Sequence, residues 1–146
     1  MTRIASVPTT SDGTPRRIRW GRIVAGASLL ELLLFVTLVP IGLVFGMPGI
    51  EGVTDFTVFF ISVPIGCFAG GYIAGAWLSK PLTSQRALHG ALMGVVATLI
   101  YLVLGAVQPD GIGPVIAGYG VVLFWANNAL RIAGATLGAT FRFGTH

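Results

Sequence analysis

Charged residues are scarce in this sequence. Only 10% of its 146 residues are charged, with nine Lys and Arg against five Asp and Glu, and the mean hydropathy is +0.86. A water-soluble globular domain is typically about one quarter charged, so this composition excludes that class. The formal net charge of +4 does not indicate a nucleic-acid partner, because the basic residues gather in segments that flank apolar runs.

Cysteine and histidine are equally scarce. The single Cys67 excludes an intramolecular disulfide. His89 and His146 lie far apart with no cysteine near them, so the sequence offers no metal-ligand spacing. It also lacks a phosphate-binding loop, a nucleophile elbow and a carboxylate pair. We therefore predict no metal, no cofactor and no catalytic residue, and a protein that is not an enzyme.

Four long apolar stretches make up most of the chain. They cover residues 23–46, 56–78, 87–107 and 115–139. Each is long enough to cross about 30 Å of hydrocarbon as a helix that rises about 1.5 Å per residue. Runs of this length without alternating polarity exclude barrel strands. We predict an all-α fold in which residues 20–142 form an antiparallel bundle of four transmembrane helices, preceded by a disordered basic tail over residues 1–19.

Basic residues fall on one side of the predicted membrane. They precede the first span, separate the second from the third, and lie in or after the end of the fourth, as Arg3, Arg16, Arg17, Arg19, Arg22, Lys80, Arg86, Arg131 and Arg142. The other two connections contain no Lys or Arg, only Glu51, Asp55 and Asp110. This positive-inside pattern predicts a multi-pass protein of the cytoplasmic membrane with both termini in the cytoplasm.

The arginines closest to the first span are a candidate lipid-binding cluster. Arg16, Arg17, Arg19 and Arg22 would each gain roughly 1 kcal/mol beside anionic headgroups. The alternative is that they determine topology without recognising a particular lipid.

Glycine is abundant, with 21 residues that lie mostly within the spans. Pairs of glycines four residues apart let another backbone approach closely, which drives helix association in lipid. The expected helix-packing positions are Gly66, Gly70, Gly71, Gly75, Gly90, Gly94, Gly134 and Gly138. They serve packing within the chain or, alternatively, the seam of a homodimer.

Two charges lie inside the predicted spans. Glu31 is roughly 13 Å from Arg22 along the first helix, and Arg131 lies at a similar depth in the fourth. An unpaired charge at this depth is costly, so we expect Glu31 and Arg131 to form an ion pair where the first and last helices close the bundle. Alternatively, Arg131 extends to the headgroups.

Two asparagines share a helical stripe with Arg131. Asn127 and Asn128 stand four and three residues before it. With Glu31 they make an intramembrane polar cluster, interpreted as a clasp that fixes the contact between the first and last helices. The alternative is a polar site for an ion, a proton or a small solute.

Two glycine-rich segments flank the predicted cytoplasmic turn between the second and third spans. Phe68–Gly75 reads Phe-Ala-Gly-Gly-Tyr-Ile-Ala-Gly, and Ala87–Gly94 reads Ala-Leu-His-Gly-Ala-Leu-Met-Gly. This pattern resembles an uncharacterised family of prokaryotic four-helix membrane proteins, over about thirty residues. The resemblance implies a bacterial or archaeal cytoplasmic membrane protein and no particular activity.

The functional expectation follows from these features. We expect a non-catalytic structural or interaction component that lies in the lipid bilayer and packs with itself as a homo-oligomer or with a larger membrane complex. The alternative is a small oligomeric transporter or channel for an ion or small solute, with its polar site between the first and fourth helices.

Overall fold

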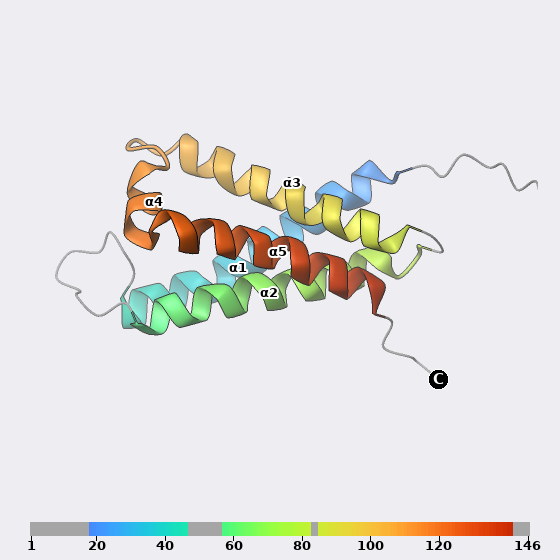
Figure 1. The fold of residues 1–146 in the computed structure, drawn as a ribbon, viewed down its shortest axis with the longest axis horizontal. Coiled ribbons are helices and arrows are strands. Elements are labelled where there is room, and N and C mark those ends of the chain that lie inside the picture. The colour runs from blue at the N-terminus through green and yellow to red at the C-terminus, as the bar shows by residue number, and fades with distance from the viewer. Residues whose placement is uncertain (1–17, 47–56, 83–84, 142–146) are drawn as a thin grey trace, which may run out of the picture.

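The computed structural model describes residues 18–46, 57–82 and 85–141, and these ranges are helical apart from short connections (Figure 1). The helices are α1 (Trp20–Phe45), α2 (Thr57–Ser79), α3 (Arg86–Ala106), α4 (Gly113–Tyr119) and α5 (Val121–Thr140). Three of them, α1, α2 and α3, are long and apolar enough to cross a membrane. The chain is therefore an all-helical protein of the multi-pass membrane class. Almost all of the tail predicted to be disordered lies outside the described residues.

The fourth predicted span is not one continuous helix. Helix α4 ends at Tyr119 and α5 begins at Val121, because Gly120 between them has a φ of 72°. An α-helix requires a negative φ, and glycine adopts a positive one without steric cost. The carbonyl of Gly120 accepts the first hydrogen bond of α5, from the N–H of Phe124 at 3.0 Å. Hydropathy does not reveal this break, because a glycine scarcely changes the mean of an apolar run.

Helix α5 packs against α2 and α3, and α1 packs against the same two helices (Figure 1). Helices α1 and α5 thus lie on opposite sides of the α2–α3 pair and share no extensive contact. The expectation that the first and last helices close the bundle by packing directly against each other is therefore wrong. The sequence gives the order of helices along the chain, and short connections permit several orders around a bundle.

The backbones of α2 and α5 approach each other closely, and these two helices share the most extensive contact in the molecule. A Cβ atom placed on Gly71 would lie 2.7 Å from the carbonyl oxygen of Arg131. On Gly138 it would overlap the carbonyl of Tyr72. Such close approach strengthens dispersion and Cα–H···O contacts, which hold helices together in lipid. Equivalent backbone overlaps would occur at Gly75 and Gly134.

The remaining glycines of the predicted set lie at other contacts between helices. A Cβ on Gly90 would lie 2.5 Å from the carbonyl oxygen of Ala135, and one on Gly94 would lie 2.6 Å from Cα of Ile132, both in α5. Gly66 and Gly70 face leucine side chains of α1. All eight predicted positions thus meet neighbouring helices of the same chain.

The start of α1, the end of α2 and the start of α3 meet at one end of the molecule. The Arg22 guanidinium donates to the carbonyl of Trp77 at 3.4 Å and lies 4.9 Å from the centre of its ring. His89 is 2% exposed, and its Nδ1 lies 2.9 Å from the carbonyl of Gln85. That carbonyl can only accept, so Nδ1 carries the proton and Nε2 accepts the backbone N–H of Arg19 at 3.3 Å.

The candidate lipid-binding arginines differ in their surroundings. Arg19 is exposed, whereas Arg22 is partly buried against α2. Arg16 and Arg17 lie outside the described residues.

Candidate functional site

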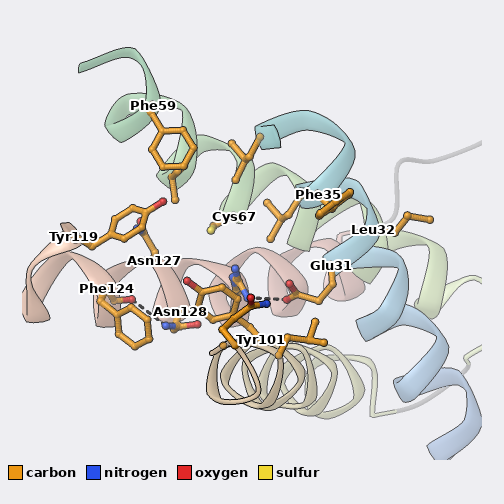
Figure 2. A pocket seen from close by; sticks show the side chains of 17 residues that line it. Glu31, Leu32, Phe35, Phe59, Cys67, Tyr101, Tyr119, Phe124, Asn127 and Asn128 are labelled. Carbon is orange, nitrogen blue, oxygen red and sulfur yellow. Dashed lines mark hydrogen bonds and ion pairs between the residues drawn. The ribbon is translucent and has the colours of Figure 1, made fainter. Parts of the chain in front are cut away.

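A buried ion pair lies at the centre of the site. Arg131 Nη1 in α5 donates to Glu31 Oε1 in α1 at 2.6 Å, and the two side chains are 7% and 15% exposed (Figure 2). Because α1 and α5 lie on opposite sides of the α2–α3 pair, the long arginine side chain bridges the interior of the molecule. Arg131 is therefore buried and paired, and does not extend to the headgroups.

The guanidinium of Arg131 also contacts α2 and α3. It lies 4.4 Å from the centre of the Tyr101 ring, a distance at which a cation is attracted to an aromatic face. The thiol of Cys67 lies beside it (Figure 2). One side chain thus joins four helices, and three of its contacts come from residues far from it in the sequence.

The two asparagines are buried near the pair without being hydrogen-bonded to it. Asn127 is 6% and Asn128 is 3% exposed. Asn128 Nδ2 donates to the carbonyl of Phe124 one turn earlier, at 2.9 Å. Within the described residues, the Oδ1 atoms of both asparagines and Nε of Arg131 have no hydrogen-bond partner. The predicted Glu31–Arg131 ion pair is therefore present, whereas the asparagines lie beside it and are not hydrogen-bonded to it.

These polar groups line a cavity of about 820 Å³. All five helices contribute to its wall, and the ion pair and both asparagines belong to that wall (Figure 2). The rest is mainly aliphatic and aromatic, and includes Leu38, Phe59, Val63, Leu104, Tyr119 and Phe124. The cavity is a mostly apolar pocket that is partly open at the surface, where the exposed Leu32 and Phe35 line it, and it contains one group of polar side chains.

The break at Gly120 positions one wall of this cavity. Tyr119, the last residue of α4, stacks edge-on against Phe60 at 5.5 Å between ring centres and lies 6.0 Å from Phe59. A continuous helix would carry Tyr119 along the axis of α5, whereas the break lets α4 take its own direction (Figure 1). The bend thus brings an aromatic side chain against α2.

Sequence reasoning missed the residues that surround the polar group. Tyr101 and Cys67 are ordinary residues of apolar runs in the sequence, and their position beside Arg131 depends on how the helices pack. The sequence does not indicate Tyr119 either, because its contact with α2 depends on the break at Gly120. No spacing in the sequence identifies any of the three.

Within the described ranges, no three His, Cys, Asp or Glu residues lie close enough to hold a metal ion. The chain matches no protein-family model, and no curated protein or solved structure shows significant similarity to it.

Proposed function

We propose that this protein is a non-catalytic membrane protein that binds a small amphiphilic molecule in the cavity between its helices. The cavity of about 820 Å³ carries this proposal. Ligand pockets are typically clefts or cavities of about 300–1,000 Å³. Such pockets have mostly apolar walls and a few polar groups that orient the ligand, and this cavity has the same composition.

The unpartnered polar atoms support a bound molecule. A buried acceptor without a hydrogen bond costs about 1–3 kcal/mol, and here two asparagine Oδ1 atoms are in that state. A ligand that donates to them would remove this cost. A purely structural role would be served equally well by apolar residues at both positions.

We also infer that α4 and α5 together make a fourth crossing, in an antiparallel bundle with both termini in the cytoplasm. Helix α5 has 20 residues, enough for about 30 Å, and runs alongside the apolar helices α2 and α3 (Figure 1). Its lower hydropathy comes from Asn127, Asn128 and Arg131, which face the interior. The basic residues around Arg22, Lys80 and Arg86 support a cytoplasmic location for the end where α1 and α3 begin and α2 ends.

The second candidate is a structural or interaction component that packs with copies of itself or with a larger complex. The glycine contacts and the ion pair favour it, because they make a firmly packed bundle without any ligand. A transporter would use the same cavity and would additionally have to open it to both sides of the membrane.

A cavity-filling substitution separates these candidates. Val63 in α2 is 5% exposed and lines the cavity, whereas Val58 in the same helix is 44% exposed and does not line it. Native mass spectrometry of the protein released from lipid nanodiscs should detect a retained small molecule in wild type and in Val58→Phe. Val63→Phe should lose it, because the added ring occupies the cavity.

The structural candidate predicts a different outcome. Wild type would then carry no retained molecule, and Val63→Phe would be more stable than wild type because it fills an empty space. Retention of the same molecule by Val63→Phe would place its binding elsewhere and would refute the proposal.

A further inference from the structure

We infer that the ligand is an uncharged amphiphile whose head group carries O–H or N–H donors, and that Asn127 and Asn128 recognise this head group. The inference rests on the proposed function, and it specifies which molecule the cavity accepts. The polar wall would hold the head group, and the wall formed around Leu38, Phe59 and Val63 would hold the apolar part.

The orientation of the Asn128 amide is fixed by its own helix. The carbonyl of Phe124 can only accept a hydrogen bond, so the atom of Asn128 that contacts it at 2.9 Å must be Nδ2 (Figure 2). The Oδ1 atom is then the free one, and it has no partner among the described residues. Asn128 therefore holds an unpartnered acceptor in the cavity wall. Its Oδ1 has almost no accessible surface, so a ligand donor reaches it only after a side chain of that wall shifts.

Asn127 adds a second free acceptor in the same wall. Its side chain is also more than nine-tenths buried, and its Oδ1 has no partner in the described part of the chain. Consecutive residues of a helix project about 100° apart, so a head group with one donor satisfies one of these acceptors, and a head group with several donors can satisfy both. A hydroxyl also accepts, so it can in addition receive the unpartnered Nε–H of Arg131.

The charges of the site disfavour an ionised head group. Glu31 and Arg131 neutralise each other at 2.6 Å, so the cavity has no net charge to offer an ion. An anion would compete with Glu31 for the guanidinium while facing two amide oxygens. A cation would have to lie beside Arg131 in a medium of low dielectric constant, where like charges repel strongly. A neutral donor avoids both penalties.

Four molecules with the same twelve-carbon chain test this inference. The protein in lipid nanodiscs is photolabelled with a diazirine derivative of 1-dodecanol, and labelled residues are mapped by mass spectrometry. Unlabelled 1-dodecanol, dodecane, dodecanoate and dodecylammonium then compete for the labelling of residues that line the cavity. Because an unsatisfied buried acceptor costs about 1–3 kcal/mol, 1-dodecanol should compete at least about fivefold more strongly than the other three.

The asparagines are tested by removing their amides. The single hydroxyl of 1-dodecanol donates to one acceptor at a time, so at least one of Asn127→Leu and Asn128→Leu should reduce the preference for 1-dodecanol over dodecane while leaving dodecane binding intact. The matched control is Thr98→Val, which removes a buried polar group of α3 that bonds the carbonyl of Gly94 and does not line the cavity. That variant should keep the wild-type preference.

The possible outcomes distinguish a failure of the head-group inference from a failure of the proposed function. Equal competition by all four molecules, or stronger competition by dodecanoate or dodecylammonium, would overturn the head-group inference and leave the cavity as a binding site. An unchanged preference in both leucine variants would also overturn it. Labelling that never reaches the cavity would refute the proposed function itself. The preference is measured first in wild type, so the test does not depend on whether a variant folds.

Discussion

The Glu31–Arg131 pair should be the strongest energetic coupling in the molecule. Both side chains are largely buried, and the contact is 2.6 Å long. Removing one partner of such a pair leaves the other buried without compensation, which typically costs about 3–5 kcal/mol. We expect Glu31→Gln and Arg131→Gln each to lower the free energy of unfolding by an amount in that range. Arg131→Gln should cost more, because it also removes the contact with Tyr101, worth about 0.5–2 kcal/mol.

The double variant is the decisive measurement. It leaves no unpaired charge, so its loss of stability should fall short of the sum of the single losses by at least about 2–3 kcal/mol. Unfolding in mixed micelles, titrated with sodium dodecyl sulfate and followed by circular dichroism, gives the four free energies. The control cycle combines Glu31→Gln with Arg22→Gln, which should add within about 0.5 kcal/mol because Arg22 contacts Trp77 instead. Additive losses for Glu31 and Arg131 would show that the observed contact carries no coupling and would refute this reasoning.

Two further predictions concern packing and topology. Gly71→Ala should lower the free energy of unfolding by about 1–3 kcal/mol, because its Cβ would lie 2.7 Å from the backbone oxygen of Arg131. Gly21→Ala meets no atom within 4 Å and should be neutral or slightly stabilising in the same micelle titration, and equal losses in both variants would contradict the packing argument. In intact cells, cysteines at Gly52 and Asp110 should react with an impermeant thiol reagent while one at Thr83 should not, and the reverse pattern would overturn the proposed orientation.

The helical architecture could be predicted from the sequence because hydropathy and length decide it. The first three predicted spans end within a few residues of the observed helices, since flanking polar residues set those limits. The fourth differed because one backbone angle at Gly120 divides it, and composition does not encode that angle. The order of helices around the bundle was also unpredictable, because it depends on which glycine faces meet.

The candidate site was predictable only in its charged members. A charge in an apolar run demands a partner, and this rule brings Glu31 and Arg131 together without any structure. The cavity itself could not be foreseen. It results from the packing of five helices around it, the bend before α5 and aromatic side chains such as Tyr119, none of which leaves a pattern in the sequence.

The length of chain between the two partners of the ion pair affects how the protein is made. Glu31 and Arg131 are 100 residues apart, and a ribosome adds about 5–20 residues per second. The acidic side chain is therefore synthesised about 5–20 s before the base that neutralises it. During that interval α1 has to enter the bilayer with an acidic residue that costs about 2.5–3.5 kcal/mol at a helix centre. The five leucines that flank Glu31 within four positions favour entry by about 0.3–0.6 kcal/mol each, which offsets most of that cost. The leucine-rich neighbourhood of Glu31 thus serves insertion as well as packing, and each leucine replaced there by a polar residue would raise the cost of inserting α1 before α5 exists.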